Sequence, residues 1–124
     1  MATILCVEDE DHIREDMAEL MEKAGHKALQ ACDGKVALEM ILEHKPDLVV
    51  SDITMPVMDG RALLMELREN HPAFADLPFI FLSALADQKD VCEGLKLGAD
   101  DYLTKPLNFE MLLAMVQSNL RQME

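Results

Sequence analysis

Short apolar runs alternate with amphipathic stretches along the whole of this sequence, and no other feature limits its fold as strongly. The apolar runs have the length and boundaries of strands, which we expect at Ile4–Val7, Lys27–Ala31, Leu48–Ser51, Phe79–Leu82 and Tyr102–Thr104. The stretches between them carry apolar residues at helical spacing, which predicts helices at Asp11–Ala24, Lys35–His44, Arg61–Asn70, Ala86–Leu97 and from the cap residue Asn108 onwards. Strict alternation of this kind is typical of an α/β protein with a parallel sheet.

The order of the strands follows from the rules for chain crossovers. Connections between parallel strands are right-handed, which leaves few topologies for five strand–helix units. The commonest is the flavodoxin-like (βα)5 three-layer sandwich with strand order 2-1-3-4-5, and we expect residues 1–124 to form it as a single domain. Its ligands bind outside the carboxyl ends of the first and third strands.

The charge and cysteine content exclude several classes of protein. Acidic residues outnumber basic ones by 24 to 11, which gives a net charge of -13, so direct binding to nucleic acid is not expected. No apolar stretch approaches the roughly 20 residues of a membrane span, so no membrane association is expected. The cysteines are odd in number and form no Cys-x-x-Cys pair, which favours a reduced, cytoplasmic protein.

Polar side chains follow four of the predicted strands directly. They are Glu8 and Asp9 after the first strand, Asp52 after the third, Ser83 after the fourth and Lys105 after the fifth. Because the carboxyl ends of parallel strands meet at one rim of a sheet, three carboxylates converge there and repel one another unless a cation is present. Carboxylate and carbonyl oxygens are ligands that Mg²⁺ prefers, so Asp9, Asp52 and the Thr54 carbonyl are candidate ligands, and Glu8 is placed to orient a bound water.

The same rim suits phosphoryl transfer, which requires positioning and charge neutralisation more than covalent chemistry by the protein. Asp52 is the natural nucleophile, because a carboxylate can form an aspartyl phosphate, and Lys105 and Ser83 are placed to contact phosphoryl oxygens. Taken alone, an Asp after a strand is more often a turn or helix-cap residue. The coincidence of matching groups after four strands favours a joint site.

Four segments resemble the receiver domain of response regulators in two-component signalling, and the resemblance extends over the whole chain. The segments are Val7–Glu10, Ser51–Gly60, Leu82–Ala84 and Gly98–Pro106. The resemblance implies that Asp52 accepts a phosphoryl group from a sensor histidine kinase or a phosphotransfer protein. It implies that Mg²⁺ is bound by Glu8, Asp9, Asp52 and the Thr54 carbonyl.

The resemblance implies roles for further residues of the rim. Ser83 would move toward the phosphoryl group, Tyr102 would turn inward behind it, Lys105 would contact its oxygens, and the Lys105–Pro106 peptide bond would be cis. Thr54 and Leu85 stand at the positions that tune autodephosphorylation. Neither side chain can act as a base toward water, so we expect slow self-hydrolysis.

The output that the resemblance implies is a two-state shift of the face formed by the fourth helix, the fifth strand and the fifth helix. That face would control a C-terminal output module or a separate effector, and phosphorylation-dependent dimerisation is one form of such control. The chain is not expected to be an enzyme beyond its own aspartyl phosphorylation and slow dephosphorylation.

Three other functions compete with this interpretation. An aspartyl-phosphate phosphohydrolase would need a second Asp two residues after Asp52, where this chain has Thr54. A flavin-binding protein would need a phosphate cradle after the first strand, where the acidic residues Glu8, Asp9 and Glu10 repel phosphate. A phosphorylation-independent adaptor that uses only its surface remains the alternative.

Overall fold

The computed structural model describes residues 2–55, 57–84 and 88–121. Its strands are β1 (Thr3–Val7), β2 (Lys27–Ala31), β3 (Leu48–Asp52), β4 (Phe79–Ser83) and β5 (Asp101–Thr104). Its helices are α1 (Asp11–Lys23), α2 (Gly34–His44), α3 (Gly60–Asn70), the 3-10 turn η1 (Pro72–Phe74), α4 (Gln88–Lys96) and α5 (Phe109–Arg121).

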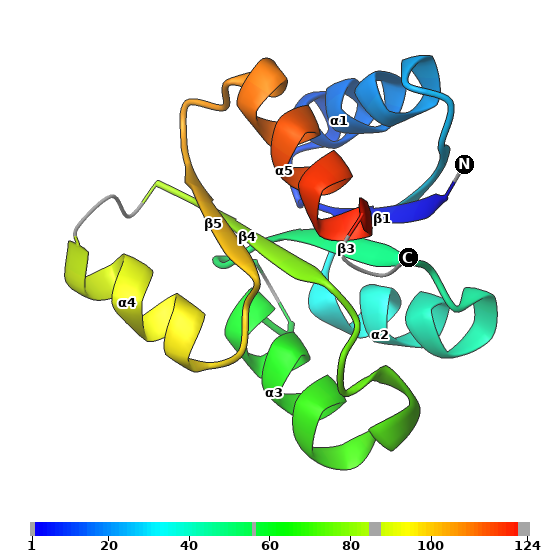
Figure 1. Ribbon diagram of the computed structural model, residues 1–124. Helices are drawn as coiled ribbons and strands as arrows, with labels where there is room; N and C mark the ends of the chain where they lie inside the picture. The colour runs from blue at the N-terminus through cyan, green and yellow to red at the C-terminus, as the bar shows by residue number, and fades with distance from the viewer. Residues whose placement is uncertain (1, 56, 85–87, 122–124) are drawn as a thin grey trace.

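The strands form one parallel sheet in the order β2-β1-β3-β4-β5, which confirms the predicted flavodoxin-like topology. Helices α1 and α5 cover one face of the sheet, and α2, α3 and α4 cover the other (Figure 1). The predicted boundaries that fall on described residues either coincide with the observed ones or differ by a single residue. The predicted start of the fourth helix, Ala86, lies outside the described residues, and η1 was not predicted.

Burial on both faces explains the apolar character of the central strands. Ile4 and Cys6 of β1 pack under α1 and α5, whereas Leu5 and Val7 belong to the core beneath α2 and α3. All five residues of β3 are buried, including Ser51 and Asp52 at its carboxyl end. Strands enclosed by two helical layers have no solvent face, so the sequence shows no alternation of polar and apolar residues.

Short polar side chains fix where three helices begin. Asp33 accepts a hydrogen bond from the Val36 amide, Asp59 from the Ala62 amide, and Asn108 from the Met111 amide, at 2.9, 2.8 and 3.1 Å. Each cap satisfies an amide in the first turn that has no partner within the helix. The starts of α2 and α3 matter most for the site, because they adjoin the segments that follow β2 and β3.

A matched pair of substitutions in α2 tests the assignment of its buried face. Ile41 is fully buried and the next residue, Leu42, is 43% exposed. We expect Ile41→Ala to lower the free energy of unfolding by about 3 kcal/mol, because it leaves a cavity, and Leu42→Ala to lower it by less than about 1 kcal/mol. Urea denaturation of both variants measures the difference, and equal losses would contradict the placement of α2.

Candidate functional site

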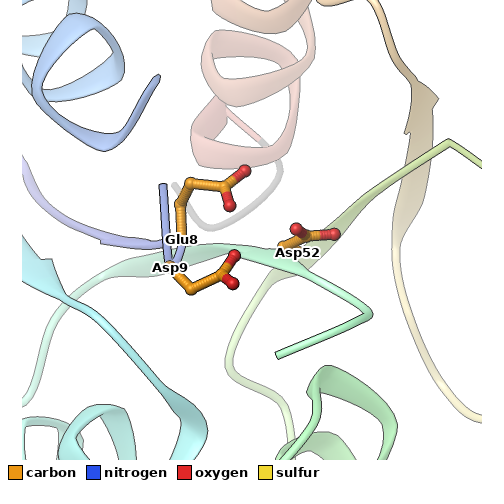
Figure 2. Close-up of side chains that lie close together, drawn as sticks. All are labelled: Glu8, Asp9 and Asp52. Atoms are coloured by element: carbon orange, nitrogen blue, oxygen red, sulfur yellow. The ribbon is translucent and has the colours of Figure 1, made fainter. Parts of the chain in front are cut away.

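Three carboxylates converge at the carboxyl ends of β1 and β3. Glu8 and Asp9 follow β1 directly, and Asp52 is the last residue of β3, which pairs with β1 so that Val7 lies opposite Ser51. One oxygen of each carboxylate lies within 4.8 Å of the others. Figure 2 shows the three side chains gathered at this rim, with Asp9 extending toward Asp52. The parallel pairing of two adjacent central strands therefore brings together the acidic residues that the sequence predicts as a site.

Two of these carboxylates are buried and share one cation. Glu8 is fully buried and Asp52 is 6% exposed, whereas Asp9 is exposed. The Lys105 ammonium donates to Glu8 Oε1 at 2.8 Å and to Asp52 Oδ2 at 3.0 Å. Partial burial by itself would lower the pKa of Lys105, but these hydrogen bonds and the nearby negative charge outweigh burial and raise it. Lys105 is therefore a cation that partly neutralises the rim.

The carboxyl end of β5 delivers Lys105 to the rim. The Lys105 amide donates to the Ser83 carbonyl at 2.7 Å, which continues the pairing of β5 with β4 for one residue beyond Thr104. The peptide bond from Lys105 to Pro106 is cis, as the resemblance implied. The pairing of β4 with β5 therefore places Lys105 next to Ser83.

Backbone contacts hold the acidic segment after β1. The Glu8 amide donates to the Ala31 carbonyl at 3.1 Å, and the Arg14 guanidinium of α1 donates to the Glu8 carbonyl at 2.9 Å. Arg14 also pairs with Asp11 at 2.7 Å. The sequence analysis missed Arg14, because nothing in its spacing shows that a side chain six residues later returns to the Glu8 carbonyl.

The proximity of the carboxylates affects the pKa of Asp9. The pKa of Asp9 is raised, chiefly because its protonated form shares a hydrogen bond with Glu8, and further because of partial burial and the Glu8 charge. Lys105 opposes this shift only weakly. Ionisation of Asp9 is therefore less favourable in the folded, metal-free site than in the unfolded chain.

The remaining predicted residues lie around this rim. Ser83, the last residue of β4, is buried, and Tyr102 is buried with its ring edge-on to Phe81 at a centroid distance of 6.3 Å. Thr54 is exposed two residues after Asp52. Leu85 lies outside the described residues. The arrangement therefore brings Glu8, Asp9, Asp52, Ser83 and Lys105 to one rim, with Tyr102 in the adjoining core.

The donor set fits a hard divalent cation. It offers carboxylate oxygens with no nitrogen or sulfur donor, and two of its three carboxylates are buried where unbalanced charge is costly. Glu8, Asp9 and Asp52 would hold such an ion. One ammonium cannot balance three carboxylates, so a dication would complete the neutralisation.

Comparison with known proteins agrees with this geometry. Residues 4–117 match the model of the response regulator receiver domain family. A probable transcriptional regulator ycf27 from Cyanidium caldarium is 38% identical over 98% of this chain and 47% of its own length. The transcriptional regulatory protein RprY of Bacteroides fragilis is 38% identical over 96% of this chain and 49% of its own length. The chain thus spans about half the length of these curated relatives.

Solved structures give the same result. The receiver domain of the Francisella response regulator 1452 superposes with a TM-score of 0.93 at 35% identity, with 100% of both chains covered. The chemotaxis response regulator CheY4 of Vibrio cholerae superposes with a TM-score of 0.89 at 31% identity, with 96% of this chain and 98% of that chain covered. A receiver domain of a histidine kinase from Syntrophus aciditrophicus has the same fold at 34% identity, a TM-score of 0.89 and coverage of 98% and 92%. This chain therefore belongs to the response regulator receiver domain family of two-component signalling.

Proposed function

We propose that this domain is a phosphoacceptor, in which Asp52 receives a phosphoryl group from a phosphohistidine with Mg²⁺ bound at Glu8, Asp9, Asp52 and the Thr54 carbonyl. The observation that carries the proposal is the Lys105 ammonium, which bridges Glu8 and Asp52 at one rim. A structural salt bridge needs one carboxylate, whereas this ammonium faces two buried ones with a third beside them. Such an excess of negative charge is expected of a site that binds a cation during its reaction.

The chemical step follows from these groups. A carboxylate oxygen of Asp52 attacks phosphorus in line with the bond to the imidazole nitrogen, the oxygen–phosphorus bond forms, and the phosphorus–nitrogen bond breaks with its electron pair left on the imidazole. Bound Mg²⁺ supplies charge neutralisation for the phosphoryl oxygens. Lys105 moves from the carboxylates to a phosphoryl oxygen, and the Ser83 hydroxyl donates to another.

We expect slow loss of the phosphoryl group from the residue types at positions 54 and 85. Thr54 is exposed beside the acceptor and carries no group that can deprotonate water, and we assign the same passive role to Leu85. The absence of an acid two residues after Asp52 also argues against a phosphohydrolase. The domain is thus a signalling element whose only chemistry is its own modification.

The output of the phosphorylated domain lies in α4, β5 and α5. Tyr102 of β5 lies edge-on to Phe81 of β4, and a Cβ added to Gly94 of α4 would lie 3.0 Å from its ring, so the ring adjoins both β4 and α4. Movement of Ser83 toward a phosphoryl group would change this packing and bias a two-state equilibrium. A sensor histidine kinase or phosphotransfer protein is the proposed donor, and an output module or separate effector the proposed target. Among the helices of residues 2–55, 57–84 and 88–121, none combines the length and apolar character needed to cross a membrane.

Intact mass tests the acceptor. We expect incubation with an acyl phosphate and Mg²⁺ to add the mass of one phosphoryl group to the wild-type chain, and to add nothing when Mg²⁺ is chelated or when Asp52 is replaced in Asp52→Asn. Asp59→Asn is the matched control, because Asp59 caps α3 and should leave the gain intact. After removal of the donor, the added mass should decay slowly.

Absence of any gain in the wild-type chain, with Mg²⁺ present, would sink the phosphoacceptor proposal. The alternative would then be an adaptor that binds its partners without phosphorylation.

Asp9 gives a test that depends on pH. Because the pKa of Asp9 is raised in the folded protein, its ionisation destabilises the metal-free fold as pH rises through that shifted range. We therefore expect Asp9→Asn to raise the melting temperature at pH 7 without metal, and to lose this advantage at acidic pH, where Asp9 is protonated. Mg²⁺ at 100 times its Kd should stabilise the wild type by about 2.7 kcal/mol and the variant by much less.

The exposed Asp16 of α1 provides the control for net charge. Asp16→Asn should change the melting temperature less than Asp9→Asn does and leave the Mg²⁺ effect unchanged. Equal Mg²⁺ stabilisation of Asp9→Asn and the wild type would exclude Asp9 as a ligand.

A further inference from the structure

Two glycines hold the segment between Ile53 and Gly60, which the structure describes except at residue 56. At its end, the Gly60 amide donates to the Ile53 carbonyl at 2.8 Å, and a Cβ on Gly60 would lie 2.4 Å from the Asp52 carbonyl oxygen. Contact this close with backbone leaves no space for a side chain. The chain therefore comes back at Gly60 to the backbone of Asp52 and Ile53, so that both ends of the segment lie next to Asp52.

A second glycine, from a different helix, holds the same segment. The Gly34 amide, at the start of α2, donates to the Met58 carbonyl at 3.0 Å. A Cβ on Gly34 would lie 2.2 Å from that carbonyl oxygen, 2.9 Å from the Met58 carbonyl carbon and 3.0 Å from its Cβ. These atoms cannot rotate away as the end of a flexible side chain does. Gly34 has no left-handed φ, so lack of space rather than backbone freedom requires glycine here.

The segment is also strained, so that its conformation depends on these contacts. Val57 has a φ of 69°, in the left-handed region that is unfavourable for a β-branched residue. Its side chain is 78% exposed, so packing of that side chain does not compensate. A strained residue persists only where its surroundings determine the backbone. The contact between Gly34 and the neighbouring Met58 is such a determinant.

We propose that Gly34 is a positioning residue for the phosphoacceptor site: its close contact with the Met58 carbonyl fixes the segment that follows Asp52 and so sets the affinity for Mg²⁺. This inference rests on the proposed function, because the segment carries Thr54, whose carbonyl is a proposed ligand. Helix α2 contributes no side chain to the carboxylate cluster, yet its first residue determines where the segment lies. A side chain on residue 34 would push Met58 away and let the strain at Val57 relax.

The test compares Gly34→Ala with Gly25→Ala. Gly25 follows α1 with a φ of 93° and open space around it, so its substitution strains the backbone without touching the segment after Asp52. We expect Gly34→Ala to raise the Mg²⁺ concentration that gives half-maximal phosphorylation by acetyl phosphate at least fivefold, with a smaller change in the rate at saturating Mg²⁺. In the metal-free protein, amide hydrogen exchange in residues 53–60 should become at least tenfold faster. Gly25→Ala should change neither quantity.

A Gly34→Ala variant that matches the wild type in Mg²⁺ dependence and in amide exchange would overturn the proposal. If Gly34→Ala alone does not fold, the comparison is made between Val57→Gly and Val57→Gly/Gly34→Ala, because glycine at 57 relieves the strain and lets the segment move aside. The same fivefold and tenfold effects are expected there, and their absence overturns the proposal. If the wild type gains no phosphoryl group, the proposed function fails, and amide exchange still decides the role of Gly34.

Discussion

The structure depends on one electrostatic interaction, the bridge from the Lys105 ammonium to Glu8 and Asp52. These three residues come from the ends of β5, β1 and β3, and both carboxylates are buried, Glu8 fully and Asp52 with 6% of its surface exposed. Buried charges without partners would cost several kcal/mol each, so the shared ammonium offsets much of the cost of placing two carboxylates side by side in the interior. The bridge also joins β5 to the centre of the sheet, at the rim that we propose as the phosphoacceptor site.

The same bridge explains how the rim can be stable and still be suited to the proposed reaction. An ammonium balances one of the three carboxylates and leaves a deficit of positive charge, which the raised pKa of Asp9 reflects. A divalent cation would remove that deficit and release Lys105 to meet an incoming phosphoryl group. In this account the sheet keeps the backbone of these residues fixed, and only the partners of the carboxylates change, from Lys105 to the divalent cation.

The sequence was sufficient to predict the strand order and the residues of the rim, because both follow from general rules. Five apolar runs with right-handed crossovers leave few topologies, of which the commonest is the one observed, and parallel strands bring their ends to one edge. Thus Glu8, Asp9, Asp52, Ser83 and Lys105 could be grouped without coordinates, and Asn108 could be predicted as a cap. The functional roles of these residues stay predictions.

Other features could not be predicted, because they depend on close approach in three dimensions. Arg68 donates to the carbonyls of Phe74, Leu77 and Gly98 from one guanidinium, and no local pattern signals such a contact. The contact of Gly34 with Met58 joins the first residue of α2 to the segment that follows β3, and the left-handed φ of Val57 contradicts the preference of a β-branched residue. In each case the tertiary structure overrides what the local sequence favours.

The most direct test of this account is the stability of Lys105→Met with and without Mg²⁺, measured by urea denaturation at pH 7. Without metal we predict a loss of roughly 2–3 kcal/mol, because the substitution leaves Glu8 and Asp52 without their shared cation. Saturating Mg²⁺ should remove most of that loss, since the dication takes over the neutralisation. A variant as stable as the wild type without metal, or a loss that Mg²⁺ does not reduce, would contradict the claim that positive charge at this rim governs both the fold and the site.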